Sequence, residues 1–153
     1  MKSGKYFNCY KNMKNIIEKS EERYKYLFEN SNTINILIGV DGRIIEVNKS
    51  AVKLLGYTKG EIIGKNALQF IVDEHRKKAS DDLNKIFKNE YTSAIELNIK
   101  AKKGVMTLLF AEGHAPLFEK GKLEGTLLSA IDITGQKIIE NKLAESERKY
   151  NFI

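Results

Sequence analysis

Residues 34–48 read INILIGVDGRIIEVN, and this stretch decides the fold class. In its first half, branched aliphatic residues at positions 34, 36, 38 and 40 alternate with other residues, which is the two-residue period of a β-strand. The pair Asp41-Gly42 follows, which is typical of a two-residue turn in which both residues have positive φ. RIIEVN then resumes an extended pattern. The sequence therefore predicts an antiparallel hairpin.

The rest of the central region divides into helices followed by strands. KSAVKLLGY at 49–57 predicts a short helix that ends at Gly56, and residues 74–89 carry apolar side chains at helical spacing. Three strands follow, in AIELNIK at 94–100, VMTLLFAEGHAP at 105–116 and LEGTLLSAID at 123–132. Two strands, several helices and three strands indicate an α+β fold with a five-stranded antiparallel sheet. The single proline, Pro116, is expected at a strand end or a bulge.

Both ends of the chain return to helical periodicity. Between residues 6 and 28, apolar or small residues recur at spacings of four and three, which is the heptad pattern of a weak coiled coil. The same spacing recurs between residues 139 and 153. We therefore expect amphipathic helices at both ends and a homodimer formed through their apolar seam. The seam residues are Ile17, Tyr24, Leu27 and Leu143.

The pattern divides the chain into three parts. We expect a coiled-coil-like helix at 1–31, a globular domain at 32–134 and a linker helix at 135–153. The phrase SEERYKYL at 20–27 is repeated in part by SERKYNFI at 146–153, with Ser, Glu and Tyr at the same places. This partial repeat predicts that the linker helix leads to a downstream domain that is missing from this sequence. The alternative is that two amphipathic helices share a similar composition.

The composition fits a globular domain outside the membrane. The chain has 153 residues, of which 42% are hydrophobic and 30% charged. No apolar run approaches the roughly 18 residues that a membrane span needs, and the single cysteine, Cys9, cannot form an internal disulfide. The net charge of +6 is spread along the chain among acidic residues, which argues against a nucleic-acid-binding stripe. We expect a cytoplasmic protein that binds neither nucleic acid nor membrane.

Several motifs, in their order along the chain, resemble the PAS domain of sensory proteins in its S-box form. They are Asp41-Gly42, Asn48, Gly56-Tyr57, Glu61 to Gly64, and Asp132-Ile133-Thr134. The resemblance covers about residues 20–137. It implies a PAS fold, in which short helices cover one face of the five-stranded sheet. It also implies a multidomain signal-transduction protein, since PAS domains often occur in tandem.

The sequence carries no pattern that predicts an enzyme or a metal site. His75 and His114 are the two histidines, both expected at solvent-facing positions, and no nucleophile motif or phosphate loop is present. Among PAS domains, a covalent flavin adduct needs a cysteine where this chain has Ala67, so the resemblance excludes that adduct. Haem-binding members carry a histidine inside the long helix, and residues 79–88 contain none, which argues against haem. The cofactor, if any, is therefore unknown.

An apolar interior remains as the candidate binding site. The resemblance implies a small cavity there, which would take a small apolar ligand with one or two polar anchors; the alternative is a fully packed core. The candidate residues are Ile36, Ile38, Val40, Asn66, Leu68, Phe70, Leu83, Phe87, Ile95, Leu97, Ile99, Phe110, Thr126, Leu128 and Ala130, with Asn66 and Thr126 as the polar anchors. In the strand at 105–116, the sequence leaves open whether Met106, Leu108 and Phe110, or Leu109 and Ala111, face inward.

We therefore expect a sensory module of a larger signalling protein, of the histidine-kinase (two-component) or cyclase type. A ligand or partner would shift the last strand, and the signal would reach the helix that follows through Asp132, Ile133 and Thr134. The alternative is a PAS module that binds no ligand and serves only interaction and dimerisation.

Overall fold

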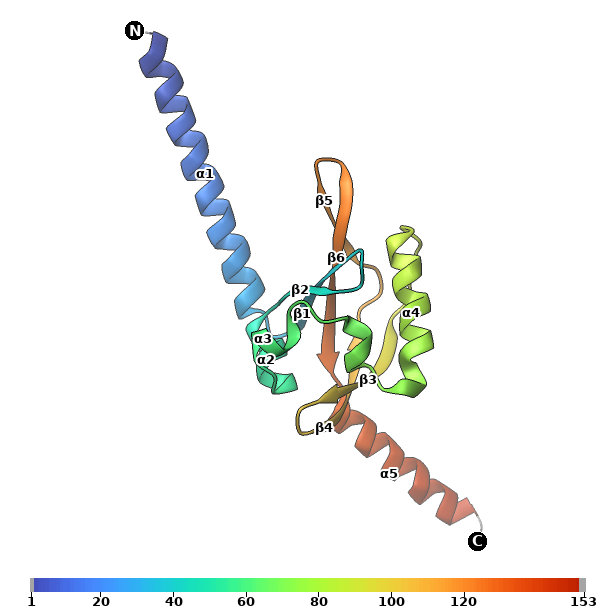
Figure 1. Ribbon diagram of the computed structural model, residues 1–153. Coiled ribbons are helices and arrows are strands. Elements are labelled where there is room, and N and C mark those ends of the chain that lie inside the picture. Colours follow the sequence, from blue (N-terminus) through green and yellow to red (C-terminus); the bar gives the residue numbers. More distant parts are fainter. Residues whose placement is uncertain (1, 152–153) are drawn as a thin grey trace.

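The polypeptide forms one antiparallel sheet with short helices over one face and a longer helix at each end (Figure 1). The computed structural model describes residues 2–151 and the side chains of residues 3–151. The elements are α1 (Lys2–Asn30), β1 (Ile34–Gly39), β2 (Ile44–Val47), α2 (Lys49–Leu55), α3 (Lys59–Ile62), the 3₁₀ turn η1 (Ala67–Phe70), α4 (Asp73–Phe87), β3 (Ile95–Ala101), β4 (Gly104–Phe110), β5 (Ala115–Glu119), β6 (Lys122–Asp132) and α5 (Thr134–Asn151). The α+β class predicted from the sequence is confirmed.

The sheet has six strands rather than the expected five. Its order is β2-β1-β6-β4-β3, and β5 pairs with β6. Both β4 and β5 pair with the edge of β6 opposite β1, because Ala130 faces Phe110 and Ile34, and Leu127 faces Ala115 and Leu37. The expected single strand at 105–116 is therefore wrong: it divides where Gly113 takes a positive φ of 76°. Pro116 lies in β5, an edge strand, where its missing N–H is tolerated.

The hairpin between β1 and β2 forms as predicted, but its turn differs. Gly42 N–H donates to the Gly39 carbonyl (2.9 Å), and Gly39 N–H donates to the Arg43 carbonyl (2.8 Å). Gly42 has a φ of 80°, whereas Asp41 is not among the residues with positive φ. These bonds define a three-residue loop with a bulge at Gly42. Asp41 Oδ1 accepts from the Arg43 N–H (3.0 Å), which is why an aspartate suits this loop.

The core lies between the sheet and the helices α2, α3 and α4. Each of the three helices contributes to the buried cluster formed with the strand residues. Examples are Ala51 from α2, Ile62 from α3 and Ala79 from α4. Along β4, Leu108 and Phe110 belong to this core, while Leu109 pairs with Ile131 on the opposite face. The question that the sequence left open for this strand is thereby resolved in favour of Met106, Leu108 and Phe110.

The two terminal helices extend away from the sheet at different ends of the molecule (Figure 1). Their seam residues are exposed: Ile17 by 54%, Tyr24 by 57%, Leu27 by 70% and Leu143 by 60%. Along the described part of α1, the buried side chain is that of Phe28, which the sequence reading overlooked in favour of Leu27. Within residues 2–151, no helix has the length and hydropathy that crossing a membrane requires. Phe152 and Ile153, the end of the partial repeat, lie outside the described residues.

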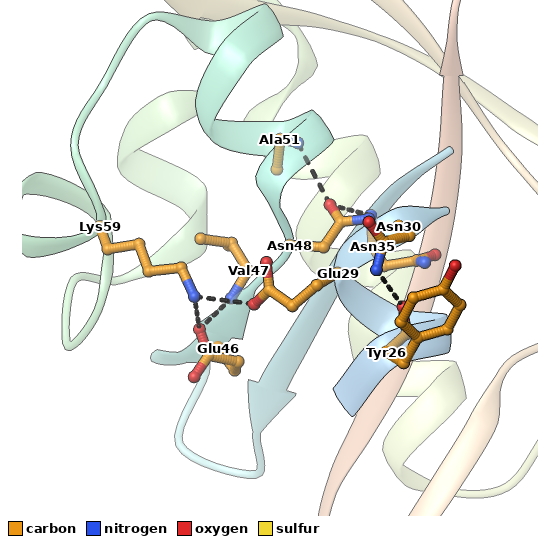
Figure 2. A network of polar contacts seen from close by, with 9 residues as sticks. All are labelled: Tyr26, Glu29, Asn30, Asn35, Glu46, Val47, Asn48, Ala51 and Lys59. Atoms are coloured by element: carbon orange, nitrogen blue, oxygen red, sulfur yellow. Dashed lines mark hydrogen bonds and ion pairs between the residues drawn. The ribbon is translucent and has the colours of Figure 1, made fainter. Parts of the chain in front are cut away.

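Asn48 joins three parts of the chain from a fully buried position (Figure 2). Its Oδ1 accepts from the N–H groups of Asn35 and Ala51, both at 3.1 Å, and its Nδ2 donates to the Thr33 carbonyl (2.8 Å). The bond from Ala51 caps α2, while the other two fix the start of β1. A single amide therefore satisfies backbone groups that would otherwise be buried without partners.

We expect Asn48→Ala to lower the free energy of unfolding by about 2–3 kcal/mol, because it removes a helix cap and leaves buried groups unpaired. Urea unfolding followed by circular dichroism measures this change. The matched control is Asn66→Ala, which removes an exposed cap with one bond to Leu68 N–H (3.0 Å) and should change the value by about 1 kcal/mol or less. Equal losses in the two variants would show that Asn48 has no special structural role.

Candidate functional site

An apolar cavity of about 80 Å³ lies inside the domain, between the inner face of the sheet and the helices. Strand residues such as Ile38 and Leu97 line one side, and helix residues such as Ile62 and Leu83 line the other. Asp82 and Thr92 are its polar lining side chains. Burial raises the pKa of the Asp82 carboxyl above its usual range, and the nearby cations Lys85 and Lys78 oppose this shift.

Most of the candidate residues named from the sequence line this cavity. They are Ile36, Ile38, Leu68, Phe70, Leu83, Ile95, Leu97, Ile99, Phe110 and Leu128. The strand members share one face because β1, β3, β4 and β6 pair in a register that aligns their alternating positions, as in the pairs Ile36–Leu128 and Ile95–Phe110. The structure therefore brings these side chains together, and their role in binding remains a prediction.

Five candidates lie elsewhere. Val40 is exposed in the hairpin loop, because the chain leaves β1 before it. Asn66 is exposed and caps η1 instead of anchoring a ligand in this cavity. Ala130 is buried in the core beside the cavity without lining it. Phe87 and Thr126 line a second cavity: Phe87 lies one residue beyond Ile86, and a helix rotates by about 100° per residue.

The sequence reading missed several lining residues that come from short elements. They include Ile44, Val47, Leu55, Ile62 and Ile71. Strands and helical turns of four to seven residues are too short for a period to show which side chain points inward. Asp82 was missed because an acidic residue on a charged helix predicts exposure, although here it borders the cavity.

The two positions weighed for cofactor chemistry can now be placed. Ala67 lines the cavity, although it was not among the candidate lining residues. His75 does not simply face solvent as expected: its Nδ1 accepts from the Asn98 N–H (2.9 Å) and ties α4 to the edge strand β3. Within the described residues, no group of three or more His, Cys, Asp or Glu side chains could hold a metal ion. The cofactor, if any, is unknown, and the exclusion of a covalent flavin adduct and the argument against haem remain predictions.

The residues proposed as a signal relay form the junction between β6 and α5. Ile133 is buried, and its N–H donates to the Thr107 carbonyl (2.9 Å). Thr134 Oγ1 accepts from the Thr107 N–H (3.0 Å), and Asp132 Oδ1 accepts from the Thr134 N–H (2.9 Å). Thr107 on β4 therefore holds both residues at the start of α5, a role that only pairing across the sheet reveals.

Ion pairs and a further hydrogen bond extend this junction to β3. Lys137 Nζ lies 2.8 Å from Glu96 Oε2 and 3.3 Å from Glu140 Oε2. Hydrogen bonds to these two carboxylates, Glu96 foremost, raise the pKa of Lys137 above its usual value. Thr107 Oγ1 also donates to Asn98 Oδ1 (2.9 Å), and Asn98 is the residue bonded to His75. A chain of hydrogen bonds thus runs from α4 across β3 and β4 to α5.

The end of α1 is fixed to the domain by a second ionic cluster (Figure 2). Lys59 Nζ lies 3.0 Å from Glu29 Oε1 and 3.1 Å from Glu46 Oε1. The hydrogen bond that Lys59 donates to Glu29 is the main cause that raises the pKa of Lys59 above its usual value, with Glu46 adding to it and burial opposing it. Glu29 is only 12% exposed, and its Oε2 has no hydrogen-bond partner among the described residues. This cluster anchors α1 to both α3 and β2.

A six-stranded antiparallel sheet, short helices over one face and a helix leaving the last strand define the PAS class of α+β domain. The sequence model of the PAS domain family matches residues 32–135 of this chain, which is more than half of the sequence. The chain belongs to the PAS domain family.

Two curated relatives are kinases of Bacillus subtilis. The chain is 29% identical to sporulation kinase E over 139 residues, covering 86% of this chain and 17% of the kinase. It is 28% identical to sporulation kinase A over 131 residues, covering 85% of this chain and 21% of the kinase. The chain therefore spans less than a quarter of the length of either kinase.

Solved PAS domains share the fold. The PAS domain of an HTR-like protein from Haloarcula marismortui aligns with a TM-score of 0.63 and 22% identity, over 80% of this chain and 99% of that one. The PAS domain of the RpfR quorum-sensing receptor from Cronobacter turicensis, solved in complex with BDSF, aligns with a TM-score of 0.56 and 23% identity, over 69% of this chain and 97% of that one.

We expect Thr134→Val to loosen the start of α5 without unfolding the domain. The variant keeps the shape of the side chain but removes the hydroxyl that accepts from the Thr107 N–H. A lost hydrogen bond of about 1–1.5 kcal/mol should speed hydrogen exchange at the Thr107 amide roughly tenfold, as measured by NMR. Thr58→Val, which alters the exposed cap of α3, is the matched control and should leave that amide unchanged. Unaltered exchange in Thr134→Val would contradict this role.

Proposed function

We propose that this chain is the sensory module of a sensor kinase, and that the state of its cavity controls how α5 is held. One observation carries the proposal: Leu108 lines the cavity and pairs with Asp132, the last residue of β6. The residue before Leu108 in β4 is Thr107, which is hydrogen-bonded to Ile133 and Thr134 at the start of α5. A shift of β4 or β6 by a bound molecule would therefore act directly on the first turn of α5.

The size and lining of the cavity indicate which ligand would suit it. An apolar cavity of about 150 Å³ accommodates benzene, so about 80 Å³ corresponds to a smaller apolar molecule of a few heavy atoms. Asp82 and Thr92 would supply the polar contacts. A longer ligand would fit this volume only if helix α4 moved away from the sheet.

The effector is proposed from the relatives. Two of them are kinases, which favours a histidine-kinase effector over a cyclase. In such an arrangement this chain would itself have no catalytic role and would act in the cytoplasm, where the kinase substrate is found. Both of these statements remain predictions for the whole protein.

A ligand-free interaction module is the second candidate. The observation that favours it is the small volume of the cavity, since native domains contain a few voids larger than a water molecule that hold no ligand. The seam helices would then act without a ligand, and a partner domain would supply the signal.

An experiment with a cavity-filling variant separates the two candidates. Leu83→Phe adds volume on the cavity wall, and Leu54→Phe makes the same exchange on the partly exposed face of α2 as a control. If the sensor proposal holds, native mass spectrometry of protein purified from its host shows a retained small molecule in the wild type and in Leu54→Phe. Leu83→Phe should lose that molecule, and the exchange rate of the Thr107 amide should change with it. Without any retained mass in the wild type, the ligand-free module is the better account.

We further propose that the protein is a homodimer formed mainly along α1, with help from α5. Large apolar side chains at Tyr10, Ile17, Tyr24 and Leu27 are more than half exposed. Covering such a side chain contributes about 1.5–3 kcal/mol, and the heptad spacing suits a second copy of the same helix. Near its end, helix α1 is attached to the domain by the buried Phe28 and by the ion pair of Glu29. The exposed part of the helix before these residues is available for contact with a second copy.

Ile17→Lys should convert the dimer to a monomer, because it places a charge on the seam twice by symmetry. Light scattering at tens of micromolar, roughly the range where weak coiled coils assemble, measures the mass, and circular dichroism should still report a folded α+β domain. Asn15→Lys places the same charge on the exposed side away from the seam and should remain dimeric. A wild-type protein that is monomeric under these conditions would refute the proposed dimer.

A further inference from the structure

A second cavity, of about 170 Å³, lies outside the proposed sensing cavity. It is bounded by the end of α4 and by the β5–β6 hairpin, which extend toward the same end of the molecule (Figure 1). Ile86 and Phe87 come from the helix, and Phe118 and Leu123 come from the hairpin. These four side chains give the cavity apolar walls from two elements that are distant in sequence.

The polar groups of this cavity favour an anion. His114 lines it, and its Nδ1 is buried without a hydrogen-bond partner among residues 2–151. Lys88, the C-cap residue of α4, lines it as well. The Thr126 hydroxyl already donates to the Ala115 carbonyl (3.4 Å), so it is not free to donate elsewhere. The described lining contains no Asp or Glu, so no carboxylate of the protein competes for His114 or Lys88.

His114 is partly buried and its Nδ1 is fully buried, so it departs from the sequence expectation that His114 faces solvent. A buried nitrogen without a partner is unfavourable, and a bound water, ion or ligand would supply the missing partner. A neutral imidazole can carry its proton on Nδ1 and donate it, while Lys88 supplies a positive charge. Because both side chains line the same cavity, they could donate together to a carboxylate bound there.

We propose that this second cavity binds a small monocarboxylate with an aromatic or short aliphatic body. The volume fits one ring, since a cavity of about 150 Å³ takes up benzene. Phe87 and Phe118 would contact the ring, and His114 and Lys88 would bind the carboxylate. The site is distinct from the proposed sensing cavity, although Ile86 of α4 lines both cavities. A ligand in the second cavity would therefore also contact α4.

Titration with phenylacetate, followed by ¹H–¹⁵N NMR, tests this proposal on the full chain. Saturable shifts are expected at the amides of Asn89, Phe118 and Leu123. Phenylacetamide has nearly the same shape but is uncharged. It should bind at least about tenfold more weakly, since hydrogen bonds to charged groups are stronger than those to neutral groups. Lys88→Gln, at an exposed position, should weaken phenylacetate severalfold and reduce the salt dependence of binding.

Replacement of the histidine provides the sharper variant. His114→Phe keeps a ring in place but removes both nitrogens, and it should weaken phenylacetate at least tenfold. Leu83→Phe, which fills only the sensing cavity, should leave phenylacetate binding unchanged, so failure of the proposed function would not imitate failure here. The proposal is overturned if phenylacetate and phenylacetamide bind alike, or if the shifts gather at Leu97, Leu108 and Leu128. It is also overturned if both His114→Phe and Lys88→Gln bind as the wild type does.

Discussion

Pairing of the last strand with the first is the constraint on which the rest of the structure depends. β6 pairs with β1 on one edge and with β4 and β5 on the other, so the hairpin at the start of the domain cannot complete the sheet until the chain has returned. The register of this pairing sets Leu128 opposite Ile36 and thereby closes the cavity wall. The same strand leads directly into α5, so the cavity and the helix share one rigid element.

Polar contacts then decide where the two long helices attach. Glu29 at the end of α1 is held by Lys59, and Thr134 at the start of α5 is held by Thr107. Both attachments involve the domain-facing turn of each helix, and the described side chains beyond those turns are exposed, apart from the partly buried Ala144. An exposed ion pair contributes less than about 1 kcal/mol, whereas one with a nearly buried carboxylate is sensitive to losing its partner. The attachment of α1 therefore depends on Glu29 keeping its lysine.

Periodicity predicted the fold because the long strands and helices each have one buried face. INILIGV and AIELNIK carry that alternation in the sequence, and both form strands. Contacts between distant residues leave no such pattern: the bond from Asn98 to His75 and that from Thr107 to Thr134 depend on strand register. The break between β4 and β5 was likewise hidden, because the single Gly113 between Glu112 and His114 does not distinguish a bulge from a break. Helix α1 was predicted, but its period alone could not show that Phe28 is the residue that turns inward.

The strength of the α5 attachment sets what a ligand in the cavity would have to accomplish. Releasing the helix would break two hydrogen bonds at Thr107, each worth about 0.5–1.5 kcal/mol, and expose Ile133, worth about 1.5–3 kcal/mol. A ligand shifts this equilibrium only by the difference between its affinities for the held and released states. Small ligands contribute at most about 1.5 kcal/mol per heavy atom. The total binding energy of a molecule of a few heavy atoms is therefore limited. Such a molecule can oppose the attachment of α5 only if most of its binding energy is lost in either the held or the released state. Such a difference would arise at Leu108, because this residue lines the cavity and pairs with Asp132 at the base of the helix.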